Sequence, residues 1–114
     1  MLNTIIDDRL QELGVTKNYK GYYQLKLAIQ LALEDDFRLQ AVSKEIYEPV
    51  AKQLGCNDYS VERNIRTISR RIWKRNPEKL CEIAKYKLYA EPSASELISI
   101  VVANIQRSQS VIST

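Results

Sequence analysis

The chain has 114 residues, of which 45% are hydrophobic and 27% charged, and these values are typical of one globular domain that buries a core without disulfides or metal. It carries a formal charge of +3 and contains no histidine. The lack of histidine removes the commonest general base and the commonest metal ligand, and the three glycines are isolated, so that no glycine-rich phosphate loop exists. We therefore expect no enzyme, no cofactor, no metal site and no small-molecule substrate.

The distribution of apolar residues and cysteines indicates a cellular compartment. The longest apolar runs are too short to span a bilayer, and the first residues, MLNTIIDDRLQ, lack the segments of a secretory signal. Cys56 and Cys81 fit neither a zinc spacing nor a disulfide framework, and we expect them to be small, buried or half-buried residues. The sequence predicts a cytoplasmic protein that has no contact with a membrane.

Apolar residues recur with the helical period along nearly the whole chain, which predicts an all-α fold. A first helix that ends at Gly14 and a second that stops near residues 34–36 are separated by the polar connection 15–21. Their apolar positions are Ile5, Ile6, Leu10 and Leu13 in the first helix and Leu25, Ala28, Ile29, Ala32 and Leu33 in the second.

The segment from Phe37 to Leu54 is interrupted by Pro49, which cannot donate an interior helical hydrogen bond. We therefore expect two short helices, with Pro49 in the first turn of the second, over residues 48–54, and Gly55 as its end. Asp58 and Ser60 are the candidate caps of the next helix, because their side chains can accept its free N–H groups.

The next helix, up to Arg75, has one apolar stripe and one basic face. Val61, Ile65, Ile68 and Ile72 recur at spacings of four, three and four, so this stripe must face the core. Six positive side chains and one negative one give residues 61–75 a charge of +5, which leaves −2 for the rest of the chain. Arg63, Arg70 and Lys74 point away from the stripe, Arg66 and Thr67 flank them, and Glu62 stands at the edge.

Two further helices complete the predicted domain. Asn76 and Pro77 are suited to cap and open a short helix that buries Leu80, Ile83 and Ala84. An extended connector follows, and a capping box of Ser93 and Glu96 starts a last helix to about Arg107, striped by Leu97, Ile100, Val101 and Ile105. We expect about six helices in a single compact domain, residues 1–107, followed by a frayed tail, residues 108–114.

The two central helices predict a helix-turn-helix over about residues 48–75. Ala51 lets the helices approach, Gly55 lets the chain turn, and Val61 faces inward, although any tight corner between helices favours such residues. The basic face lies on the second helix, which in this motif enters the major groove of DNA. In an ordinary solvated helix the cations would instead pair with acids four residues away, as Arg66 could with Glu62. One acid, however, cannot neutralise six cations. Trp73 is expected to pack against a neighbour, and Tyr19, Tyr22 and Tyr23 are expected to lie in the core or at its rim rather than to bind a ligand.

Four segments in the same order, GVTKNYKGYYQLKLAI, YEPVAKQLG, SVERNIRTISRRIW and PSASEL, resemble the C-terminal effector domain of the master sporulation response regulator of endospore-forming Firmicutes. The resemblance implies six helices around a helix-turn-helix and sequence-specific binding of double-stranded DNA at a promoter box, through the major groove. It implies a transcription regulator, with tandem pairing on adjacent boxes and RNA polymerase as further candidate partners. It also implies that Glu62 and Arg63 read base edges beside Arg66, and the candidate DNA-binding residues are Ser60, Glu62, Arg63, Arg66, Thr67, Arg70 and Lys74.

Three departures from that family pattern bear on regulation and affinity. We expect the receiver domain, whose aspartate is phosphorylated in the family, to be absent or on a removed segment. The connector carries Tyr89, Ala90 and Glu91 before Pro92 where the family tends to have lysines, and Arg70 and Arg71 together add charge. The alternative function is a protein-interaction module that pairs with a full-length regulator or the transcription machinery without reading DNA.

Overall fold

Helices make up most of the computed structural model, which describes residues 2–113 of the backbone and the side chains of residues 3–109. In chain order they are α1 (Leu2–Glu12), α2 (Tyr22–Glu34), the 3-10 segment η1 (Asp36–Ala41), the π-helical segment η2 (Ser43–Tyr47), α3 (Glu48–Leu54), α4 (Asp58–Arg75), α5 (Pro77–Ala84) and α6 (Ala94–Ser113). No strand occurs within residues 2–113, which confirms the predicted all-α fold with about six helices. Over the same residues, no helix is both long and apolar enough to cross a membrane.

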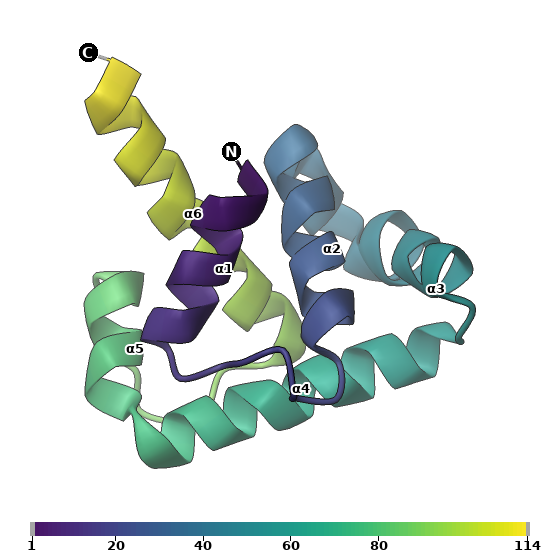
Figure 1. Ribbon diagram of the computed structural model, residues 1–114, viewed down its shortest axis with the longest axis horizontal. Helices are drawn as coiled ribbons and strands as arrows, with labels where there is room; N and C mark the ends of the chain where they lie inside the picture. The colour runs from purple at the N-terminus through teal and green to yellow at the C-terminus, as the bar shows by residue number, and fades with distance from the viewer. Residues whose placement is uncertain (1, 114) are drawn as a thin grey trace.

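Helix α4 runs along one side of the molecule, and α2, α3, α5 and α6 pack against it (Figure 1). Its predicted apolar stripe is buried, with at most 2% of any side chain exposed, and consists of Val61, Ile65, Ile68 and Ile72. Burying each such side chain contributes roughly 1.5–3 kcal/mol, so the stripe holds α4 at one rotation about its own axis. The charged residues on the opposite side of α4 must therefore face outward.

The connection from α1 to α2 passes directly over α4. Gly21, the last residue of this connection, has a φ of 90°, and a Cβ at this position would lie 2.6 Å from the Cβ of Asn64 in α4. Beside this contact, the Asn64 amide donates a hydrogen bond to Gln24 Oε1 at 2.9 Å. The start of α2 thus lies against the middle of α4, at a distance that only glycine allows.

Helix α1 is attached to α2 by a polar cluster. The Tyr22 hydroxyl donates to the Asp7 carboxylate, and Lys26 Nζ lies 2.9 Å from Asp7 Oδ1. The Tyr22 hydrogen bond and the Lys26 charge hold the pKa of the Asp7 carboxyl below its ordinary value, whereas burial and the Asp7 charge raise the pKa of the Tyr22 phenol. These contacts fix the angle between the two helices.

Pro49 lies in the first turn of the second of two short helices, as predicted, but no turn or loop separates these helices. Segment η2 continues directly into α3, and both Tyr47 and Glu48 have right-handed helical backbone conformations. Because Pro49 has no N–H, it cannot donate a helical hydrogen bond to the carbonyl of Glu45, four residues earlier. The Arg38 guanidinium donates to that carbonyl instead, at 3.1 Å, and the wider π turn before Pro49 accommodates the interruption. The predicted helix over residues 48–54 and its end at Gly55, with a φ of 68°, are confirmed.

Two predicted helix caps are wrong in detail. The cap of α4 is Asn57, whose side chain accepts from the Ser60 N–H at 2.8 Å, and Asp58 and Ser60 both lie inside the first turn. Asn76 makes no side-chain cap bond to α5, and its amide donates to the Glu12 carbonyl at 3.5 Å. Because Asn57, one residue before Asp58, caps the free N–H groups of the first turn, α4 begins earlier than predicted.

The last helix, α6, is longer than predicted. Ser93 Oγ accepts from the Glu96 N–H at 3.1 Å, as a capping box requires, while the Glu96 carboxylate accepts from the Tyr86 hydroxyl at 3.2 Å. The helix continues past Arg107 to Ser113, and Arg9 Nη2 lies 3.4 Å from Ser108 Oγ. The predicted frayed tail, residues 108–114, reaches beyond the described residues, which exclude Thr114 and the side chains of residues 110–113.

The close contact at Gly21 generates a prediction about stability. Gly21→Ala should lower the free energy of unfolding by about 2–4 kcal/mol, because it adds a clash with Asn64 to the cost of a left-handed backbone. Gly14→Ala is the matched control, since Gly14 has a similar φ of 85° but a Cβ added there would meet no heavy atom within 4 Å. It should cost about 1–2 kcal/mol. Urea unfolding measures both, and equal losses would show that the contact with α4 is unimportant.

Candidate nucleic-acid interface

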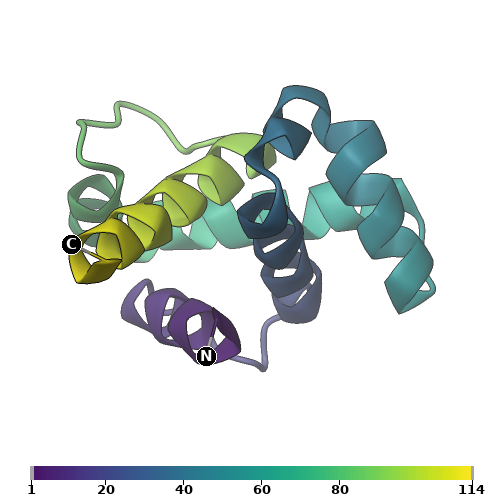
Figure 2. The ribbon, with the colours of Figure 1, turned by 90° about the horizontal axis from the view of Figure 1, so that it is seen from above.

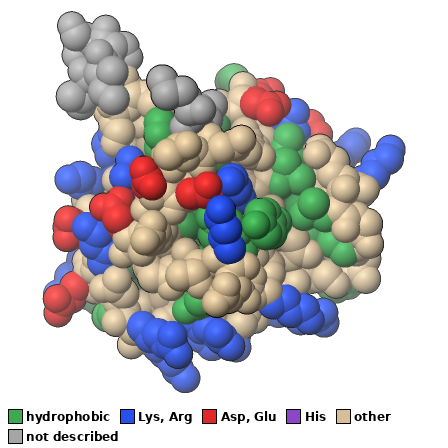
Figure 3. Space-filling model, viewed as in Figure 1, with side chains coloured by type: hydrophobic (Ala, Val, Ile, Leu, Met, Phe, Trp, Pro, Cys, Tyr) green, Lys and Arg blue, Asp and Glu red, His purple; other side chains and the backbone are tan. Residues whose placement is uncertain are grey.

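The seven candidate residues from the sequence all lie on α4, and most of them project outward. Arg63, Arg66, Thr67, Arg70 and Lys74 are exposed, while Ser60 and Glu62 are half-buried. In Figure 3, Lys and Arg side chains gather along the lower edge of the molecule, where α4 runs in Figure 1. We call the exposed residues Arg63, Arg66, Thr67, Arg70 and Lys74 the outer face of α4.

The positive charges of α4 are only partly neutralised within the protein. Arg66 Nη2 lies 3.7 Å from Glu62 Oε1, which is the pair that an ordinary solvated helix predicts, and Arg70 Nε lies 3.5 Å from Glu91 Oε2 in the connector. Among the described residues, no ion pair engages the remaining four cations, Arg63, Arg71, Lys74 and Arg75. Helix α4 as a whole therefore keeps an excess of positive charge that an anionic partner could neutralise.

Helices α3 and α4 form the predicted helix-turn-helix. Val50 and Ala51 of α3 and Val61 of α4 are buried together in the core, and the chain turns over residues 55–57. The Cys56 N–H bonds to the Ala51 carbonyl at 2.9 Å, which closes α3 beyond Gly55. In such a motif the second helix is the one presented to a partner, and here it carries the outer face.

The acidic residue near the start of α4, Glu62, faces η2. It lines a hollow of about 310 Å³ together with Ser43, Tyr47, Asp58 and Tyr59. Burial raises the pKa of the Tyr47 phenol to about 12, and the nearby Glu62 charge acts in the same direction. The N-terminal turns of α4 are thus acidic on the side of η2, and its cations follow from Arg63 onward.

The connector between α5 and α6, residues 85–93, lies along one flank of α4. Ser69 is fully buried, and its hydroxyl donates to the Pro92 carbonyl at 2.6 Å. One residue further along α4, Arg70 reaches Glu91 of the same connector. Neither contact was predicted from the sequence. The position of Ser69 beside Ile68, at the margin of the stripe, was the only sequence signal for its burial, and the partners became apparent only from the packing.

The connection between α1 and α2 lies along the opposite flank of α4, as Figure 2 shows from above. The guanidinium of Arg71 stacks over the Tyr19 ring at 5.4 Å from its centroid, and Arg75 Nη1 lies 3.5 Å from the Tyr19 hydroxyl. Neither arginine was among the predicted site residues. A helical projection places Arg71 on this flank, but its pairing with Tyr19 depends on how the connection folds back. Trp73 is half-buried against the core, as predicted.

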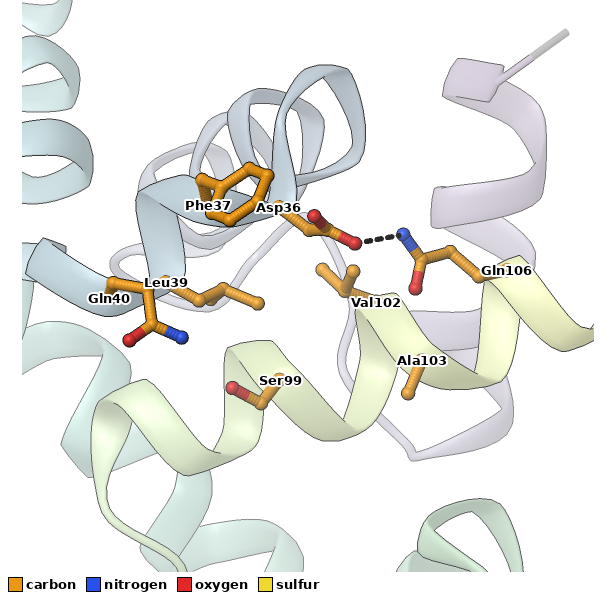
Figure 4. A pocket seen from close by; sticks show the side chains of 8 residues that line it. All are labelled: Asp36, Phe37, Leu39, Gln40, Ser99, Val102, Ala103 and Gln106. Atoms are coloured by element: carbon orange, nitrogen blue, oxygen red, sulfur yellow. Dashed lines mark hydrogen bonds between the residues drawn. The ribbon is translucent and has the colours of Figure 1, made fainter.

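A larger hollow, of about 520 Å³, lies away from α4, between η1 and α6 (Figure 4). Its floor includes Leu39 and Val102, and the Gln106 amide donates to Asp36 Oδ2 at 3.3 Å at one end. Phe37 stands at its margin with 79% of its surface exposed. This hollow, lined by four apolar and four polar residues, is a second surface at which a partner could bind.

A comparison with protein families identifies the family to which the chain belongs. A family model described as Sporulation initiation factor Spo0A C terminal matches residues 6–105, from the middle of α1 through most of α6. The matched region includes both helices of the helix-turn-helix and both connections that flank α4. This family is the DNA-binding domain of a regulator of sporulation, and it is not an enzyme family. The chain therefore belongs to the family Sporulation initiation factor Spo0A C terminal.

Proposed function

We propose that this protein binds double-stranded DNA in a sequence-specific manner and regulates transcription, with α4 inserted in the major groove. The observation that carries the proposal is the outer face of α4: the second helix of a helix-turn-helix presents cations, Arg63 and Lys74 among them, that no acid of the described residues neutralises. DNA phosphates would supply the missing negative charge and release counterions on binding.

The dimensions of α4 suit this role. Its 18 residues correspond to a rod about 27 Å long, and the major groove, about 12 Å wide, admits one α-helix. The N-terminal residues of a recognition helix contact base edges, and we therefore propose Arg63 and Glu62 as the residues that read the sequence. Arginine donates to guanine O6 and N7, and glutamate accepts from cytosine N4. Ser60, Arg66, Thr67, Arg70 and Lys74 then contact the backbone or neighbouring bases.

A protein-interaction module remains the second candidate function, and the hollow beside Phe37 is the observation that favours it. In this alternative the protein pairs with a full-length regulator or with the transcription machinery and does not read DNA itself. Salt discriminates between the two functions, because binding through several phosphates weakens steeply as salt rises, whereas a mainly apolar contact changes little.

A prediction about DNA binding separates residues that read bases from residues that contact only phosphates. Arg63→Ala should weaken binding to a cognate duplex, obtained by selection from random sequences, by roughly 1–3 kcal/mol and relax the preference at one base pair. Lys74→Ala should weaken cognate and scrambled duplexes equally and lower the salt slope by about one charge. Both side chains are exposed, so the free energy of unfolding should change by less than about 1 kcal/mol.

A salt titration of both variants with both duplexes provides the measurement. An unchanged ratio of cognate to scrambled affinity in Arg63→Ala would remove Arg63 as a base reader. If the parent protein binds neither duplex, or if both variants bind as tightly as the parent, DNA binding by α4 is refuted.

A further prediction concerns the ion pair that Arg70 forms with Glu91. Glu91→Gln should tighten binding to all duplexes by up to about fivefold, because it frees Arg70 for a phosphate and removes a negative charge beside the DNA. Glu82→Gln is the matched control: it removes one equal charge from α5, where Glu82 pairs with Lys79 at 3.3 Å. Equal gains in affinity in the two variants would mean that net charge alone is responsible. No gain in affinity in either variant would mean that Glu91 does not repel DNA.

A further inference from the structure

The flank of α4 that faces the α1–α2 connection contains a small basic pocket. Its volume is about 120 Å³, and its lining residues are Leu13, Gly14, Tyr19, Arg71, Ile72, Arg75 and Asn76. Two of these residues are cationic and none is acidic. The pocket thus combines two guanidinium groups, a phenol hydroxyl and an amide around a space large enough for a single small anion.

We propose that this pocket binds one backbone phosphate of duplex DNA, through Arg71, Arg75 and the Tyr19 hydroxyl. The proposal rests on the proposed function and extends it to residues outside the outer face of α4. Neither arginine forms an ion pair within the described part of the chain, so a phosphate meets no internal competitor there.

The side chains of the pocket are arranged in advance of binding. The cation–π contact with the Tyr19 ring, at 5.4 Å from its centroid, restricts the Arg71 guanidinium, and Arg71 forms no ion pair within the described residues. Arg75 donates to the Tyr19 oxygen at 3.5 Å, so the hydroxyl hydrogen of Tyr19 is free to donate to another acceptor. Planar guanidinium groups bind phosphate oxygens in pairs of parallel hydrogen bonds, which gives the contact a defined geometry.

The position of the pocket on α4 fits a backbone phosphate better than a base. At 3.6 residues per turn, Arg71 lies roughly 90° around the helix from the centre of the buried stripe, whereas Arg63 and Arg70 lie nearly opposite that stripe. A helix of about 10–12 Å diameter fills a groove about 12 Å wide, so residues on its flanks meet the sugar-phosphate backbone at the groove edge.

The connections beside the two flanks of α4 differ in their acidic residues, which gives the proposed contact a direction. The α5–α6 connector holds Glu91, which pairs with Arg70 and repels phosphate, as well as the exposed Lys85 and Lys87. The α1–α2 connection, residues 13–21, contains no acid, and its Lys17 and Lys20 are exposed. The proposed phosphate contact therefore lies on the flank whose connection carries no acid.

The test combines charge-removing variants with duplexes that lack single phosphate charges. Arg71→Gln and Arg75→Gln should each weaken binding of the whole chain to the selected duplex roughly tenfold and reduce the salt slope by about 0.9. Tyr19→Phe keeps the ring under Arg71 and should produce a smaller loss, of about two- to threefold. Lys79→Gln is the control, because it removes one positive charge from α5, where Lys79 already pairs with Glu12 at 3.7 Å.

Replacing one phosphate at a time by a neutral methylphosphonate identifies the bound group. One position at the groove edge should weaken the parent roughly tenfold and have a clearly smaller effect on Arg71→Gln or Arg75→Gln, because each variant has already lost one of the two arginines that bind this phosphate. Urea unfolding of each variant separates a binding defect from a folding defect, and the methylphosphonate effect is measured within one protein, so it does not depend on stability.

Each outcome has a distinct meaning. If the parent binds the duplex but Arg71→Gln and Arg75→Gln lose no more affinity than Lys79→Gln, the pocket is overturned and the proposed function stands. If the parent binds no duplex, the proposed function itself fails, and the assignment of DNA phosphate to this pocket fails with it. If inorganic phosphate shifts the amide signals around Tyr19 at millimolar concentration while no methylphosphonate position depends on Arg71, the ligand is a small free anion and the DNA contact is overturned.

Discussion

The buried stripe of α4 is the constraint on which the rest of the structure depends. Val61, Ile65, Ile68 and Ile72 pack into the common core, and this packing fixes the rotation of α4 more firmly than any surface contact could. Once that rotation is set, the cations of the outer face project into solvent, and the two flanks of α4 receive the two connections. The approach of Gly21 to Asn64 and the bond from Ser69 to Pro92 then hold those connections in place.

Two of the departures that the sequence resemblance implies, at Arg70 and at Glu91, are neighbours in space. Arg70 adds a positive charge to the outer face, and Glu91 places a negative charge in the connector that runs beside it. The pair lies at the surface, where its net contribution to folding stability is less than about 1 kcal/mol. Its main consequence therefore concerns binding: Glu91 offsets the charge that Arg70 adds. The charge of Arg71 has no such partner among the described residues and lies on the opposite flank, over Tyr19.

The sequence was sufficient for those features that depend on local periodicity and failed for those that depend on packing. The four-residue stripe of α4 and the end of α3 at Gly55 follow from helical spacing and backbone conformation, and both were predicted. The direct continuation of η2 into α3 was not, because it depends on Arg38, which satisfies the Glu45 carbonyl from outside these two helices. Likewise, the outer face of α4 follows from a helical projection, but the pairing of Arg71 with Tyr19 requires two segments that are distant in the sequence.

The most direct test of DNA binding by α4 is an NMR titration of the isotope-labelled protein with its selected duplex. We expect the largest changes in amide shift along α4, at Arg63, Arg66 and Arg70, and unchanged signals around Phe37 and Val102. These two surfaces lie on different elements, so the shifts assign the interface without any substitution. Changes confined to the hollow between η1 and α6, with α4 unaffected, would contradict the claim that the outer face of α4 binds DNA.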